Sequence, residues 1–70
     1  MDRFDAVRVN GKEDPEASGR TIQEIVTAKR LDPETVVVEL NEAIVPKDRY
    51  ASTVVAKGDA VEILHFVGGG

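Results

Sequence analysis

Residues 21–30 carry the periodicity and the end signals of a helix, and this segment restricts the possible folds more than any other. Thr21 and Glu24 have the spacing of a capping box, in which the hydroxyl and the carboxylate each accept a backbone N–H of the first turn. The apolar stripe behind the cap comprises Ile22, Ile25, Val26 and the aliphatic part of Lys29. Pro33 prevents continuation. We therefore expect a helix from Thr21 to about Arg30, with Lys29 and Arg30 in the last turn, where the helix dipole favours cations.

The segment before this helix has the pattern of a β-hairpin. We expect a first strand over residues 4–9, in which Val7 and Val9 alternate with Arg8 and so give one apolar and one polar face. Asn10-Gly11 follows, and this dipeptide favours the tight type I′ turn that joins hairpin strands. We expect the second strand to cover residue 12 to about residue 16. Pro15 cannot donate a backbone hydrogen bond, so this strand is expected at an edge of the sheet or to end early.

The segments after the helix read as further strands separated by turns. The β-branched run at 36–40 is expected to be a strand, with Val36, Val38 and Leu40 facing the core. Residues 43–45 are a shorter strand candidate that Pro46 stops. We expect one irregular helical turn at 47–50, brief edge pairing at 53–55, and a turn at 57–59 in which Gly58 supplies a positive φ. The last strand is expected at 60–67, with Val61 and Ile63 facing the core and Leu64 and Phe66 facing the other way.

The order hairpin, helix, strand, short strands, strand favours an α+β fold. A single main helix can cover only one face of a small mixed sheet of four to five strands. The right-handed crossover rule then places the last strand beside the first, in the centre of the sheet. This arrangement is the β-grasp, or ubiquitin-like, fold. We expect residues 1–67 to form this domain and residues 68–70 to form a flexible glycine tail.

Size and composition limit the functions available to the chain. Its 70 residues are enough for one domain with a thin core. It has no cysteine and a single histidine, His65, so we expect neither a metal site nor an enzyme with a cleft of its own, and His65 is read as a passive residue near the tail. The net charge of -4 disfavours nucleic acid. No apolar run approaches the length of a membrane span. We expect a cytoplasmic protein, monomeric when alone, with no bound cofactor.

The sequence ends in His65-Phe66-Val67-Gly68-Gly69-Gly70. Glycines lack a Cβ, so Gly68 and Gly69 suit a segment that threads a narrow channel and carries the carboxylate of Gly70 about 10 Å beyond the sheet. A carboxylate is a poor electrophile until it is coupled to a good leaving group such as AMP. The terminus is therefore a candidate reactive group that another enzyme activates. The alternative is a frayed end or an expression scar.

Several motifs, taken in order, resemble the ThiS family of sulfur carriers in thiamine thiazole synthesis. They are Val9-Asn10-Gly11-Lys12, Thr21-Ile22-Gln23-Glu24-Ile25, Asn41-Glu42-Ala43-Ile44-Val45-Pro46, Lys47-Asp48-Arg49-Tyr50, Gly58-Asp59-Ala60-Val61-Glu62-Ile63 and the HFVGGG end. The family pattern usually ends in two glycines, and Gly68 is a third. The charged beginning, residues 1–5, is slightly longer than is usual in the family.

The resemblance implies a mechanism and partners. A ThiF-type adenylating enzyme would use ATP to adenylate Gly70, and sulfur supplied from cysteine by a desulfurase would convert the acyl adenylate to a thiocarboxylate. Thiazole synthase (ThiG) would then take that sulfur into the thiazole ring. The chain itself would be a protein co-substrate rather than an enzyme. Gly70 would bear the sulfur, with Gly68 and Gly69 as the threading segment.

Candidate partner-binding residues precede the glycines. An exposed apolar patch on a small domain marks a docking surface more often than not, so Leu64, Phe66 and Val67 are assigned to partner binding. Alternatively, Leu64 and Phe66 pack against the segments around Tyr50 and Val54. Glu39, Glu42 and Glu62 are most simply a solvated face, of which one or two meet basic residues of the activating enzyme.

Three functional alternatives stay open at this point. The first is a sulfur carrier for another pathway, such as molybdopterin synthesis, tRNA thiolation or cysteine synthesis. The second is a ubiquitin-like modifier that is joined through Gly70 to lysines of other proteins. The third is a non-covalent interaction module with an inert tail.

Overall fold

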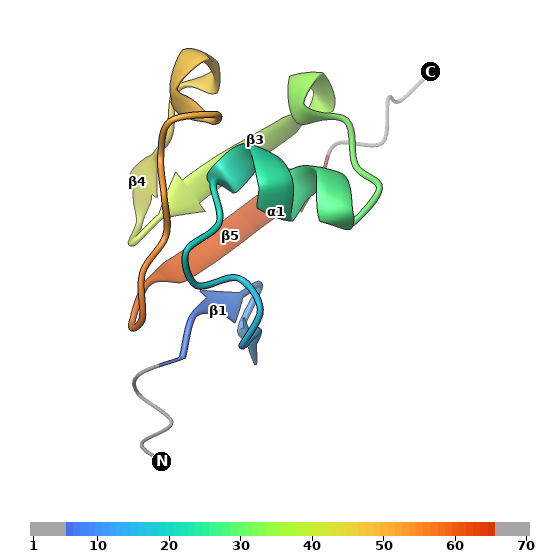
Figure 1. The fold of residues 1–70 in the computed structure, drawn as a ribbon. Helices are drawn as coiled ribbons and strands as arrows, with labels where there is room; N and C mark the ends of the chain where they lie inside the picture. The colour runs from blue at the N-terminus through green and yellow to red at the C-terminus, as the bar shows by residue number, and fades with distance from the viewer. Residues whose placement is uncertain (1–5, 66–70) are drawn as a thin grey trace.

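The computed structural model describes residues 6–65, which form a five-stranded sheet with one α-helix packed on it (Figure 1). The strands are β1 (Arg8–Val9), β2 (Lys12–Glu13), β3 (Val36–Leu40), β4 (Ala43–Ile44) and β5 (Ala60–His65). The expectations for residues 4 and 5 in the first strand, for Phe66 and Val67 in the last strand and for the Gly68–Gly70 tail lie outside the described residues. Between residues 6 and 65, no helix has the length and apolar character needed to cross a membrane.

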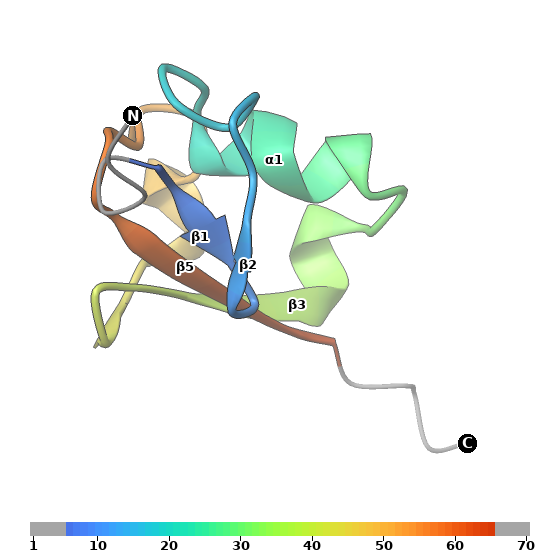
Figure 2. The same ribbon diagram turned by 90° about the horizontal axis from the view of Figure 1, so that it is seen from below.

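The sheet is mixed, and its strand order is β2-β1-β5-β3-β4. β5 lies in the centre, where it pairs parallel with β1 and antiparallel with β3. The expectation that the last strand lies beside the first is therefore confirmed. Helix α1 (Ile22–Ala28) covers one face, and Figure 2 shows no described helix on the opposite face. This layering of one helix on a mixed sheet is the β-grasp arrangement.

The beginning of α1 confirms the capping box. Thr21 Oγ1 accepts the Glu24 backbone N–H at 3.1 Å, and Glu24 Oε1 accepts the Thr21 backbone N–H at 2.9 Å. Each bond satisfies a donor that the first turn of a helix leaves free.

The end of α1 differs from the expectation of a helix to Arg30 with two cations in its last turn. The helix ends at Ala28 with Lys29 as its C-cap, and Arg30 has a φ of 61° that no right-handed helix accommodates. The Leu31 N–H bonds to the Val26 carbonyl at 3.3 Å, which is the long bond of a Schellman motif. Leu31 packs against the core, so burial of its side chain accompanies this early closure.

The hairpin strands are shorter than the sequence pattern predicts. β1 begins at Arg8, and β2 ends at Glu13 rather than near Glu16. Asp14 causes the early end, because its carboxylate accepts the Glu16 backbone N–H at 3.1 Å and turns the chain out of the sheet. The expected place of β2 at an edge of the sheet is confirmed.

The remaining short elements largely follow the expected pattern. The turn at 47–50 is a 3₁₀ helix over Lys47–Arg49, and Gly58 has a φ of 88°. The pairing at 53–55 is a single bridge between Val54 and Thr21. β4 ends before Val45, whose buried side chain nevertheless joins the core.

The core lies between the sheet and the helix layer. Its buried apolar residues are Val7, Val9, Ala17, Ile22, Ile25, Val26, Val36, Val38, Val45, Tyr50, Val55, Val61 and Ile63. The inward positions expected on the two long strands are confirmed, with Leu40 partly buried at the margin. In the described part of the chain no polar or charged residue is buried, so the core needs no internal ion pair.

Candidate functional site

The end of β5 is the described segment nearest to the glycines. Leu64 pairs with Val37 of β3, and His65 pairs with Val36. Since side chains alternate along a strand and Ile63 is buried, Leu64 lies on the sheet face opposite α1. Its side chain is 42% exposed, and its assignment to partner binding stays a prediction. The other assigned residues, Phe66, Val67 and Gly68–Gly70, lie outside the described residues.

The sheet face opposite α1, here called the open face, combines apolar and acidic side chains. Residues paired directly across strands lie on the same side of a sheet, so the Val37–Leu64 pair, the Glu39–Glu62 pair and Ile44, which pairs with Glu39, share this face. Ile44 is 68% exposed. The open face thus holds one row of Ile44, Glu39 and Glu62, and a second row of Val37 and Leu64 that is closer to the C-terminal end of β5.

The open face has a charge arrangement that favours a basic partner. Glu39 and Glu62 stand directly opposite each other on adjacent strands. Like charges in this position repel and destabilise the sheet slightly. A guanidinium or ammonium group brought between them would relieve this repulsion and would also accelerate encounter with a basic surface.

Leu64 does not pack around Tyr50, as the alternative assignment would require. Tyr50 is 2% exposed and belongs to the core on the helix side of the sheet. The partly buried apolar side chains packed against that core are Leu31 and Leu40.

The first residue of β3, which pairs with the last described residue of β5, is held by two side chains. Lys47 Nζ donates to the Val36 carbonyl at 2.8 Å and to the Pro33 carbonyl at 3.2 Å. The Tyr50 hydroxyl donates to the same Val36 carbonyl at 3.3 Å. Lys47 Nζ also lies 5.8 Å from the centroid of the Tyr50 ring, within the range of a cation–π contact. These contacts fix the strand against which the end of β5 is paired.

Substitution of Tyr50 by Phe is expected to change the alkaline stability of the domain. Burial raises the pKa of the Tyr50 hydroxyl above its ordinary value of 10.0. The folded state therefore holds this proton more tightly, and the resulting stability is complete below the unfolded pKa and is lost as the pH rises through the folded pKa. Tyr50→Phe should cost about 1 kcal/mol near pH 7, because Lys47 still satisfies the Val36 carbonyl.

Urea unfolding at neutral pH and at several values around pH 10 tests this expectation. The wild type should lose more stability than Tyr50→Phe over the alkaline range. Parallel losses in both proteins would show that other groups, such as the lysines common to both, cause the alkaline unfolding.

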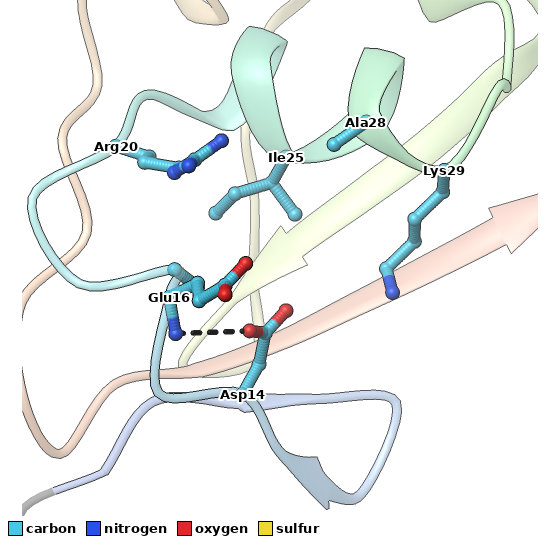
Figure 3. A pocket seen from close by; sticks show the side chains of 7 residues that line it. Asp14, Glu16, Arg20, Ile25, Ala28 and Lys29 are labelled. Carbon is cyan, nitrogen blue, oxygen red and sulfur yellow. Dashed lines mark hydrogen bonds between the residues drawn. The ribbon is translucent and has the colours of Figure 1, made fainter.

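A hollow of about 200 Å³ lies on the helix side, between α1 and the loop that follows β2 (Figure 3). It is lined by Asp14, Glu16, Ala17, Arg20, Ile25, Ala28 and Lys29. Ligand sites for small molecules are usually about 300–1,000 Å³ and mostly apolar. This hollow is smaller and carries both signs of charge, and its lining contains no serine, threonine, cysteine or histidine. It gives no reason to assign a catalytic cleft.

Sequence reasoning missed two members of the open face, Val37 and Ile44. The predicted inward positions of Val36 and Val38 leave Val37 facing outward, but Val37 was not assigned to partner binding. Ile44 lies in a run of three apolar residues, so the pattern alone does not indicate which of them is exposed. The register between β3 and β4 decides the position of Ile44, because Ile44 shares a face with Glu39 only when the two strands pair as observed. His65 is exposed at the end of β5, and its passive role stays a prediction.

Known structures share this fold. The crystal structure of a thiamine biosynthesis protein (ThiS) from Geobacter metallireducens superposes with a TM-score of 0.74 at 37% identity, covering 93% of this chain and 99% of that one. A solution structure of the Geobacter metallireducens thiamine biosynthesis protein gives a TM-score of 0.75 at the same identity. The fold is thus the ubiquitin-like β-grasp.

Curated relatives are of two kinds. The sulfur carrier protein ThiS of Bacillus subtilis is 42% identical over 50 residues, which are 71% of this chain and 76% of that protein. The thiazole synthase of Magnetococcus marinus is 33% identical over 64 residues, which are 91% of this chain but 20% of that protein. The thiazole synthase of Paramagnetospirillum magneticum matches similarly, and this chain spans about a fifth of the length of each synthase. The model of the ThiS family matches residues 5–70, nearly the whole sequence, so the chain belongs to the ThiS family.

Proposed function

We propose that this protein is a sulfur carrier of thiamine biosynthesis, and that the carboxylate of Gly70 carries the sulfur. The observation that supports this most is the family match, which extends through residue 70 and so includes the three glycines. The similarity to the Bacillus subtilis sulfur carrier supports the same role. The position of β5 in the centre of the sheet adds a physical reason. A strand that is hydrogen-bonded on both sides holds in place the start of a segment that must reach into another protein.

The proposed chemistry needs no catalytic group of this chain. An oxygen of the Gly70 carboxylate attacks the α-phosphorus of ATP in a ThiF-type enzyme, and pyrophosphate leaves. A sulfur nucleophile, charged from cysteine through a desulfurase, then attacks the acyl carbonyl, and AMP leaves with the oxygen. The attacking group is a protein persulfide, so the product is an acyl disulfide between Gly70 and the donor. A second thiol then attacks the donor sulfur, forms a disulfide with it and leaves the outer sulfur on Gly70 as a thiocarboxylate. Gly68 and Gly69 thread the channel, and the protein acts as a co-substrate.

Thiazole synthase is the proposed acceptor of the sulfur. Two thiazole synthases contain a segment similar to 89–91% of this chain, so a domain of this kind occurs in the same polypeptide as that enzyme. Such a linkage raises the effective concentration of one domain at the other, which is useful when the two must meet in each cycle.

The open face is the proposed docking surface for the adenylating enzyme. Val37, Leu64 and Ile44 supply apolar area, and Glu39 and Glu62 supply negative charge. The open face includes β5, the strand that precedes Phe66 and Val67 in the sequence, and these two residues are proposed to extend the docking surface. A partner of matching chemistry would offer an apolar patch beside an arginine or a lysine.

The decisive test is incubation of the full chain with ATP, a ThiF-type enzyme, a cysteine desulfurase and cysteine, followed by intact-mass measurement. A carrier gains the mass of one oxygen-to-sulfur exchange on its C-terminal peptide. A ladder of conjugates with other proteins would instead identify a modifier. Addition of thiazole synthase with its other substrates should remove the sulfur again, whereas a carrier for another pathway would keep it.

Substitution of Leu64 by Ser is expected to weaken docking without unfolding the domain. Loss of a central apolar contact should raise the KM of the adenylating enzyme for this chain about tenfold, which corresponds to about 1.4 kcal/mol. Val54→Ser is the matched control, because Val54 is 57% exposed but lies in the bridge to Thr21 rather than on the open face. Steady-state pyrophosphate release measures both variants. An equal rise in KM for both would show that Leu64 has no special place in docking.

A further inference from the structure

Two asparagines with the same positive φ bond to β5 from opposite sides. Asn10 follows β1, Asn41 follows β3, and each has a φ of 52°. Asn41 Oδ1 accepts the Ala60 N–H at 2.9 Å, and its Nδ2 donates to Asp59 at 3.0 Å, at the start of β5. Asn10 contacts β5 at Ile63, much nearer to the glycines.

The Asn10 side chain takes the place of a strand residue. Its Oδ1 accepts the Ile63 backbone N–H at 2.7 Å, and its Nδ2 donates to the Ile63 carbonyl at 3.3 Å. A primary amide offers one acceptor and donors in a plane, as a peptide group does. The Asn10 backbone N–H already bonds to the Val61 carbonyl at 2.8 Å, so the side chain extends the parallel ladder by one further position.

This extension compensates for the shortness of β1. β1 ends at Val9, and the positive φ of Asn10 turns the backbone into the hairpin loop. β5 continues to His65, where β3 still pairs with it on the other side. Among residues 6–65, the Asn10 amide makes the hydrogen bonds nearest to His65 on the β1 side of β5.

We propose that Asn10 is a positioning residue for the reactive terminus, and that its amide sets the direction in which β5 delivers Gly70 to the adenylating site. This inference rests on the proposed sulfur-carrier function. Val67, after which the expected flexible tail begins, is four residues beyond Ile63, a reach of roughly 13–14 Å when extended. A tilt of about 10° at Ile63 would then displace the start of the tail, and with it the region that the carboxylate can reach, by about 2 Å. Misplacement of a reacting group by about 1 Å can lower the rate about 100-fold.

Docking and positioning predict different kinetic effects. The open face is unchanged when Asn10 is altered, so the KM of the adenylating enzyme should stay within about twofold. The kcat should fall about tenfold or more, because fewer bound complexes hold the carboxylate in line with ATP. This is the reverse of the effect expected for Leu64→Ser.

The experiment compares Asn10→Gly with Asn41→Gly. Glycine adopts positive φ without strain, so each variant loses a side-chain amide while the turn is preserved. The two should have similarly lowered unfolding midpoints. With a ThiF-type enzyme and ATP, at a temperature where both are folded, kcat for pyrophosphate release should fall in Asn10→Gly and stay within about twofold of wild type in Asn41→Gly. Backbone hydrogen exchange at Ile63 should accelerate in Asn10→Gly alone.

Three results would overturn the inference. An unchanged kcat in Asn10→Gly would show that the amide does not position the terminus. An equal loss of kcat in both variants would show a general effect of stability. If the wild type itself released no pyrophosphate, the proposed function would fail and this inference with it. The first two results leave the carrier function intact, so the two failures are distinguishable.

Discussion

Removal of Gly69 and Gly70 is expected to abolish thiocarboxylate formation while the domain stays folded. Under the proposed mechanism the carboxylate of Gly70 is the reacting group, and a chain shortened by two residues cannot bring its new terminus to the same place. The buried core of the described chain runs from Val7 to Ile63, so the truncation removes none of its contacts. Intact-mass measurement after incubation with ATP, a ThiF-type enzyme and a sulfur source should detect no sulfur.

The truncated chain also provides its own control. Because it keeps the open face, it should inhibit adenylation of the full chain competitively, and its thermal unfolding midpoint should match that of the wild type. Full biological activity of the truncated chain would instead support an interaction module with an inert tail. Loss of inhibition together with loss of folding would show that the truncation damaged the domain rather than its reactive end.

Replacement of Ile22 by Ala should have the largest effect on stability. Ile22 is fully buried, and removal of such a side chain costs about 2–5 kcal/mol. The total stability expected for a domain of this length is only about 4–10 kcal/mol. The variant should therefore unfold at a much lower urea concentration and be partly unfolded at physiological temperature.

Ile44→Ala is the matched control for this substitution. The same atoms are removed, but Ile44 is 68% exposed on the open face, so the cost should be within about 0.5 kcal/mol. Urea unfolding monitored by circular dichroism compares the two. Similar costs for both would contradict the assignment of inward and outward positions.

Local sequence signals account for most of the secondary structure. The capping box at Thr21 and Glu24, the β-branched run at 36–40 and the Asn10-Gly11 turn act over a few residues, so each is visible without the rest of the chain. The predicted end of the helix was wrong because Leu31, which lies beyond the periodic stripe, is drawn to the core and closes the last turn early. The length of β2 was overestimated because the Asp14 carboxylate competes with the ladder for a backbone N–H.

The register of strand pairing decides which side chains lie together on the open face. Leu64 was identified from alternation in one strand, since the predicted inward positions of Val61 and Ile63 leave Leu64 on the other face. The outward position of Val37 likewise follows from the inward positions predicted for Val36 and Val38, although Val37 was not assigned to partner binding. Ile44 was not identified, because a short strand with three apolar residues in succession has no unique inward side until it is paired. The facing carboxylates of Glu39 and Glu62 likewise follow from the pairing of β3 with β5.

The sequence by itself determined the helix and its cap, and the position of the last strand beside the first. It also determined the family and the glycines at the end of the chain. All of these depend on neighbouring residues or on motifs in a fixed order. Only the tertiary structure decided that Asn10 reaches Ile63, 53 positions away, and that Val36 is held by Lys47 and Tyr50. The reason is physical: these are hydrogen bonds between groups far apart in the chain, and their formation requires the sheet to bring those groups within about 3 Å.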